Sequence, residues 1–135
     1  DFFNDTNRQD IQFKDATAKM LGGPMGAITR PQLVIPKTDI VALYIDDAGA
    51  RANIHLLRRI ERCILYLPGL VCRAEVHMGA ETRWQDALDL MPNDFFGATA
   101  AMAYPLAALP GPFPQQTDLL MLNRRHVKMF HVEPA

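Results

Sequence analysis

The chain has 135 residues, of which 49% are hydrophobic, enough for one ordinary core and hardly for two. Its formal net charge of -1 excludes a globally basic nucleic-acid binder. The charges are nevertheless uneven, because residues 1–50 sum to -2, 51–62 to +3, 63–123 to -4 and 124–135 to +2. A nearly neutral chain can therefore carry two local basic patches.

Residues 1–37 are predicted to form an extended N-terminal arm, ahead of a single domain at 38–135. A short helix over residues 16–21 would end at Gly22-Gly23-Pro24, and Pro31 and Pro36 would keep the rest extended. The apolar side chains of the arm predict docking on a neighbouring protein, with a free terminus as the alternative. These side chains are Phe2, Phe3, Ile11 and Phe13.

The first residue is Asp1 and not methionine. This start predicts processing after import into a mitochondrion or another organelle, although secretion, precursor cleavage and a truncated sequence predict the same start. No transmembrane segment is expected from the sequence.

Residues 40–45 are apolar on both faces and predict a central strand. A long helix is expected after it, with Asp47 as N-cap and Pro68-Gly69 as its end. At about 100° per residue, the apolar side chains of this helix share one arc. Its opposite face presents four basic residues, Arg51, His55, Arg58 and Arg62.

Residues 70–78 alternate between apolar and polar side chains and predict a second strand, with Arg73, Glu75 and His77 on one face. A helix between two strands predicts a right-handed crossover and a parallel pair. A short helix over residues 82–92 and a hairpin of strands 119–122 and 127–132 follow. The expected fold is α/β with a mixed sheet in the order β-α-β-α-β-β, a topology that resembles thioredoxin-like domains.

Residues 95–117 contain no charged side chain and four prolines, which predict a loop instead of a helix or central strand. An uncharged loop of this length is expected to bury its apolar side chains against a partner protein, the alternative being a loop folded over its own core. The predicted interface residues are Phe95, Phe96, Met102, Tyr104, Leu106, Leu109 and Phe113.

Few residues predict catalytic chemistry. Residues 44–47, Tyr-Ile-Asp-Asp, match the paired-aspartate tetrapeptide of reverse transcriptases, whose carboxylates hold divalent metal ions. Helix capping by Asp47 is the simpler interpretation. The chain has no serine, which excludes a serine triad, and its two cysteines, Cys63 and Cys72, form no CxxC pair. No cofactor is expected.

The basic residues give the clearest functional signal. The arginines of the predicted helix, together with Arg124, Arg125 and Lys128, are predicted to bind an anionic partner. The sequence therefore predicts a non-catalytic accessory subunit of a larger protein assembly, such as a respiratory-type complex or an organellar ribosome, with RNA as a further possible partner. The alternative is a small enzyme that uses Asp46 and Asp47 with a divalent metal.

Overall fold

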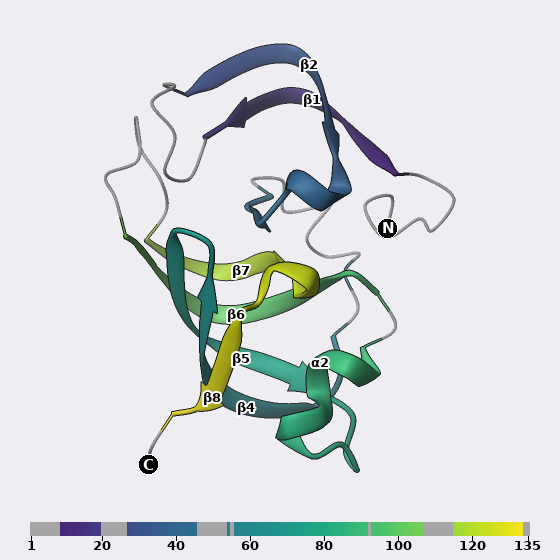
Figure 1. Cartoon of the computed structure of the whole chain (residues 1–135), viewed down its shortest axis with the longest axis vertical. Coiled ribbons are helices and arrows are strands. Elements are labelled where there is room, and N and C mark those ends of the chain that lie inside the picture. Colours follow the sequence, from purple (N-terminus) through teal and green to yellow (C-terminus); the bar gives the residue numbers. More distant parts are fainter. Residues whose placement is uncertain are drawn as a thin grey trace.

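The computed structural model describes residues 9–19, 27–45, 54, 56–91, 93–106 and 115–133. This part of the chain is mainly β and contains two antiparallel sheets (Figure 1). A two-stranded sheet pairs β1 (Asp10–Ala18) with β2 (Ile28–Pro36). A six-stranded sheet has the order β3-β7-β6-β5-β4-β8. The predicted α/β, thioredoxin-like fold is therefore wrong.

The bounds of the remaining elements follow the chain. The strands of the six-stranded sheet are β3 (Ala42–Leu43), β4 (Arg59–Leu67), β5 (Leu70–Met78), β6 (Phe95–Pro105), β7 (Gln116–Asn123) and β8 (Met129–Val132). The helical turns are η2 (Lys37–Asp39), η3 (Trp84–Asp86), α2 (Ala87–Leu90) and η4 (Arg124–His126). None of these described helical segments has the length and apolar character needed to cross a membrane.

Strand β4 replaces the second half of the predicted long helix. Cys63, Leu65 and Leu67 are buried, while Arg62 is exposed and the residues between them are only partly buried. This alternation has the two-residue period of a strand, and the same apolar residues also fit a helical arc. Pro68-Gly69 joins the paired residues Leu67 and Leu70 as a tight turn in which Gly69 has a φ of 70°. The expected helix stop is therefore a hairpin turn, for which proline followed by glycine is suited.

Strand β5 confirms the strand predicted at residues 70–78. Its buried side chains alternate with partly exposed ones along the full length. The pairing differs from the prediction, because β5 lies antiparallel to β4 through the tight turn. The parallel crossover is therefore wrong, and no helix is needed to connect these two strands.

Residues 95–105 form strand β6, so the first half of the predicted proline-rich loop is wrong. All four prolines of the segment lie at or after position 105, so none removes a backbone donor from the interior of the strand. Ala100 has a φ of 46°, next to the point where the register with β5 shifts between Arg73 and Glu75. This is a β-bulge, which bends the strand and increases its twist. Residues 107–114 of the predicted loop lie outside the described residues.

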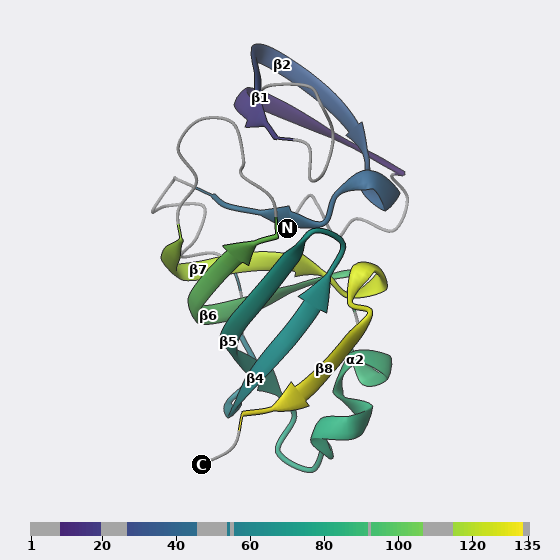
Figure 2. The ribbon, with the colours of Figure 1, turned by 60° about the vertical axis from the view of Figure 1, so that its left-hand side comes forward.

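The two C-terminal strands do not pair with each other. Strand β7 lies between β3 and β6, whereas β8 pairs with β4 through residues 63–66 of β4. The short turn η4 joins β7 to β8, which is possible because the sheet curls strongly and brings its two edges toward each other (Figure 2). The predicted terminal hairpin is therefore wrong, although its two strand segments are present.

Two cores stabilise this arrangement. The larger core fills the curl of the sheet, where Trp84 of η3, Ala87 of α2 and Met91 just after α2 pack. The smaller core lies between the β1–β2 hairpin and the other face of β6 and β7. Ile11 is 1% exposed there, so the predicted arm docks on its own chain. Residues 16–18, expected in a short helix, continue strand β1, while Phe2 and Phe3 lie outside the described residues.

Candidate interaction surface

Strands β8, β4, β5 and β6 present a broad outer face, on the side of the curl away from the larger core (Figure 2). The side chains alternate along each strand, so every second residue points outward. We call these side chains, together with Glu133 just after β8, the outer face. Its members are Arg62, Ile64, Tyr66, Val71, Arg73, Glu75, His77, Thr99, Met102, Tyr104, Met129, His131 and Glu133.

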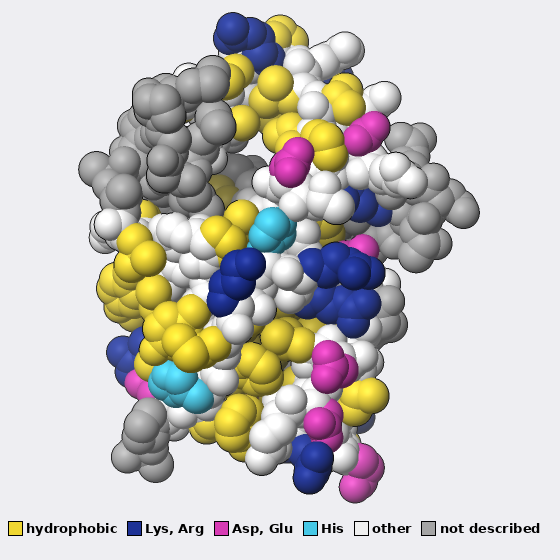
Figure 3. Space-filling view, in the orientation of Figure 1, with side chains coloured by type: hydrophobic (Ala, Val, Ile, Leu, Met, Phe, Trp, Pro, Cys, Tyr) yellow, Lys and Arg dark blue, Asp and Glu magenta, His cyan; other side chains and the backbone are white. Residues whose placement is uncertain are grey.

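The strand register arranges these side chains in rows across the sheet. Tyr66 lies opposite Met129 on one side and Val71 on the other, and Val71 lies opposite Tyr104. The two tyrosines are therefore two strands apart, about 10 Å at ordinary strand spacing. Met129 is 58% exposed and Tyr104 is 46% exposed. Figure 3 shows hydrophobic side chains gathered on the left-hand flank of the molecule, where these strands lie.

Tyr66 and His131 form a fixed pair on this face. The Tyr66 hydroxyl and His131 Nε2 are 3.1 Å apart and share a hydrogen bond. The ring centroids are 5.7 Å apart, with 38° between the ring planes. Two side chains that hold each other have less conformational entropy to lose when a partner binds, so this pair is preorganised.

Two arginines hold one carboxylate beside that pair. Arg62 Nε donates to Glu133 Oε2 at 3.3 Å, and Arg73 donates to Glu133 Oε1. Hydrogen bonds from Arg73 and Arg62 lower the pKa of the Glu133 carboxyl from its usual value, so it is charged at neutral pH. Arg73 Nε is buried and has no hydrogen-bond partner among the described residues.

At the His77 end of the outer face, the sheet contacts residues 56 and 57, which lead into β4. His77 Nδ1 lies 3.0 Å from the Leu57 carbonyl oxygen, and His77 Nε2 lies 2.6 Å from Thr99 Oγ1. The Thr99 hydroxyl is also 3.3 Å from Glu75 Oε1. Gly97 permits the close approach of this segment, because a Cβ there would lie 2.6 Å from Leu56 Cδ2. Glu75 and His77 thus share a face, as predicted, and are linked through Thr99.

The described members of the predicted basic set lie in separate parts of the structure. Arg51 and His55 lie outside the described residues, while Arg58 is exposed and Arg62 belongs to the outer face. Arg124 Nη1 donates to the backbone carbonyls of Leu88 and Met91, and thereby ties the end of α2 to η4. Arg125 Nε donates to Asp94 Oδ1 at 3.0 Å. Lys128 donates its backbone N–H to the Tyr66 carbonyl.

The predicted apolar interface is divided by strand β6. Phe95 is 1% exposed and Phe96 is 7% exposed, so both pack inside the protein, one in each core. Met102 and Tyr104 lie on the outer face, and Leu106 after β6 is 70% exposed. Leu109 and Phe113 lie outside the described residues. The exposed side chains of the predicted set that the structure describes therefore lie at the end of β6.

The metal prediction falls mainly outside the described structure, because Asp46 and Asp47 are not among the described residues. Within the residues that are described, no three His, Cys, Asp or Glu side chains gather in the way that a metal ion requires. Cys63 and Cys72 are free thiols in the larger core.

Both thiols should react slowly with a thiol reagent in the folded protein. Burial, with a smaller effect of Glu61, raises the pKa of Cys63 from 9.0 to about 11, and burial raises that of Cys72 to about 12. Labelling with an aromatic disulfide at pH 8 should therefore need denaturant to reach completion. The folded state binds these protons more tightly, so this contribution to stability is full below about pH 9 and is lost as the pH rises through 11 to 12. Rapid native labelling would contradict the burial of these side chains.

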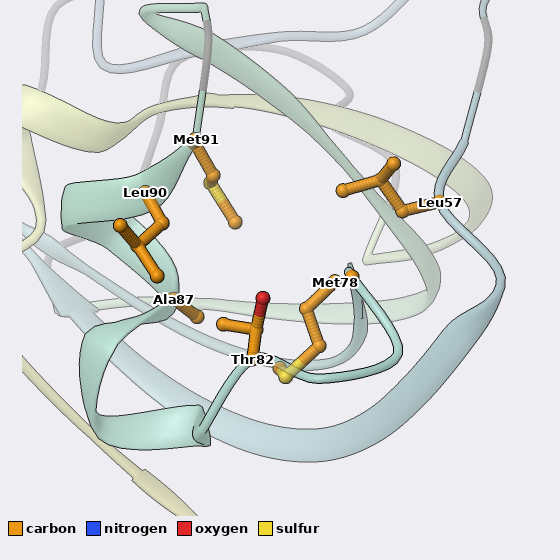
Figure 4. A pocket seen from close by; sticks show the side chains of 7 residues that line it. Leu57, Met78, Thr82, Ala87, Leu90 and Met91 are labelled. Carbon is orange, nitrogen blue, oxygen red and sulfur yellow. The ribbon is translucent and has the colours of Figure 1, made fainter.

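A small hollow lies at the end of the curl, between α2 and the β5 terminus (Figure 4). It holds about 190 Å³ of empty space including the part open to solvent, which is less than the ~300 Å³ of small ligand pockets. The lining contains no titratable side chain, and the Thr82 hydroxyl is its polar side-chain group. Its lining residues are Leu57, Met78, Gly79, Thr82, Ala87, Leu90 and Met91.

Sequence reasoning did not single out Tyr66, Arg73, His131 and Glu133 as a site. Arg62 was assigned to a helical stripe, and its actual partner Glu133 lies 71 residues away in sequence. The alternation at residues 62–66 was the available signal, because it places Arg62, Ile64 and Tyr66 on one face of a strand.

Comparisons with protein families, with curated proteins and with solved structures found no match for this chain.

Proposed function

We propose that this protein is a non-catalytic accessory subunit that docks on another protein of a larger assembly through its outer face. The observation that carries the proposal is the composition of this face, on which tyrosine, methionine and arginine side chains stand together on a rigid sheet. These three residue types are enriched in protein interfaces. The proposal replaces the predicted helix stripe and proline-rich loop as docking elements.

The charges of the outer face favour a protein partner over RNA. Two arginines, Arg62 and Arg73, are balanced by two glutamates, Glu75 and Glu133. Nucleic-acid binding depends largely on an excess of cations that neutralise phosphates. A mixed surface with exposed apolar side chains is better suited to a protein surface of complementary shape and charge.

The test measures the native mass of the protein after gentle isolation from the cells that produce it. One variant, Met129→Glu, places a charge on the outer face. The natural chain should run in a complex of defined composition, and Met129→Glu should release it. Val34→Glu is the matched control, because Val34 is 60% exposed on the β1–β2 hairpin. A monomeric natural chain would overturn the proposal, and so would a Met129→Glu protein that stays in the complex.

A further inference from the structure

The contact of Glu133 with two arginines has the chemistry of ligand recognition. Arg62 and Arg73 come from neighbouring strands and converge on one carboxylate, which is 18% exposed. Guanidinium groups bind carboxylates through paired, charge-assisted hydrogen bonds. Both arginine side chains stay accessible, Arg62 at 46% and Arg73 at 42%. A partner carboxylate can therefore reach the same two cations from solvent.

Glu133 leaves part of this donor set unused. It accepts from Arg62 Nε and from one terminal nitrogen of Arg73. Arg73 Nε stays buried without an acceptor, which is a costly arrangement for a charged donor. Because Nε is buried, a carboxylate that approached from solvent would engage the terminal nitrogens of Arg73, of which Glu133 accepts from only one.

Glu133 is also held by few contacts. It follows β8, an edge strand of four residues that pairs with β4 alone. Its backbone N–H donates to the Arg62 carbonyl, which is its one backbone hydrogen bond among the described residues. Because edge strands with few partners open at low free-energy cost, the end of β8 can release the carboxylate without unfolding the core.

The surroundings would strengthen binding of a partner carboxylate. The Tyr66–His131 pair lies beside Glu133, since His131 and Glu133 share a face of the same chain segment. Met102 lies opposite Arg73 on the next strand. These side chains would exclude water from the contact and so raise its electrostatic strength.

We infer that Arg62 and Arg73 form a carboxylate-recognition site for an acidic, extended segment of a protein partner, in which Glu133 acts as a resident, displaceable competitor. The inference rests on the proposed function, since it names the chemistry of the partner at the same face. The competitor is built into the chain, so it weakens binding of any acidic segment that lacks enough apolar contacts to displace it.

The experiment uses the full chain and a fluorescein-labelled peptide of alternating valine and glutamate. The Glu133→Gln variant should bind this peptide about tenfold more tightly than the natural chain, because the resident carboxylate no longer competes. Adding Arg73→Gln to this variant should abolish the gain. A valine–glutamine peptide of the same length is the control and should show no gain. Circular dichroism checks that each variant keeps the β fold.

Unchanged affinity in Glu133→Gln would overturn the inference, as would an equal gain for the valine–glutamine peptide. If Glu133→Gln raised the affinity for a single-stranded oligothymidylate more than the affinity for the valine–glutamate peptide, the partner would not be a protein. The site would then be assigned to nucleic-acid phosphates. These outcomes are separate from the native-mass test, because a complex that depends on Met129 can exist without displacement of Glu133.

Discussion

Replacing Phe95 with alanine should lower the free energy of unfolding by about 3–5 kcal/mol. Phe95 is 1% exposed and packs in the smaller core with Ile11, Ile40, Leu119 and Met121. These residues come from the β1–β2 hairpin, the segment after η2, and β7, so one side chain stabilises the contact among all three. Urea denaturation followed by circular dichroism measures the change.

Tyr104→Ala is the matched control, because Tyr104 lies on the same strand and is 46% exposed. Its loss should change stability by less than about 1 kcal/mol, as surface substitutions usually do. Phe95→Leu should recover much of the stability lost in Phe95→Ala, since it refills most of the cavity. If Phe95→Ala were as stable as Tyr104→Ala, Phe95 would not be a core residue and its predicted interface role would return.

The sequence predicted single strands better than their pairing. Strand β5 was predicted with its bounds and its alternation, because nine residues of apolar and polar side chains in turn are a strong local signal. The C-terminal strand segments were also recognised. Their partners were not, since β8 pairs with β4, more than 60 residues earlier, and no local pattern encodes that contact.

The helix predicted at residues 47–67 failed for a different reason. In residues 59–67 the spacing of apolar side chains satisfies both the 3.6-residue period of a helix and the two-residue period of a strand. The Pro68-Gly69 turn then decides the structure, because it pairs β4 with β5 through the whole length of both strands. Residues 46–53, which contain the predicted N-cap, lie outside the described residues, so the start of that helix is not tested.

The candidate site could not be predicted from the sequence for the same reason, because its residues are far apart in the chain and meet only through strand pairing. Arg73 was correctly placed on the polar face of a strand, but Glu133, the residue that marks it as a recognition site, lies 60 positions later. In the linear sequence, Arg73 and Glu133 lie in two segments of opposite net charge, -4 for residues 63–123 and +2 for residues 124–135. No local pattern brings together Arg62, Arg73 and Glu133, whereas the register of β8 on β4 does so directly.

Asn123 makes a second non-local contact, at the point where the chain leaves β7 for β8. This side chain is 1% exposed, at the junction of β7 and η4. Its Nδ2 group donates to the carbonyl oxygens of Lys37 at 3.1 Å and Ile40 at 2.9 Å. Its Oδ1 accepts from the Arg125 backbone N–H at 3.0 Å. One amide therefore connects the segment that follows the β1–β2 hairpin to the turn that leads into β8.

Asn123→Ala should lower the free energy of unfolding by about 3 kcal/mol, because the Ile40 carbonyl and the Arg125 backbone N–H lose the partner that Asn123 provides, and each such group costs roughly 1–3 kcal/mol. Asn123→Asp tests the donors alone, since the side chain keeps its shape and can still accept from Arg125. It should destabilise at least as much as alanine, because a carboxylate would face the Lys37 and Ile40 carbonyls.

The matched control is Asn93→Ala, at an exposed position before β6, which should stay within about 0.5 kcal/mol of the natural chain. Thermal and urea unfolding give the values, and native proteolysis shows whether the hairpin segment is released. An Asn123→Asp protein as stable as the natural chain would mean that the two donated hydrogen bonds contribute nothing. The junction would then depend on apolar packing, and the position of β8, with Glu133 at its end, would have to be fixed by its pairing with β4 alone.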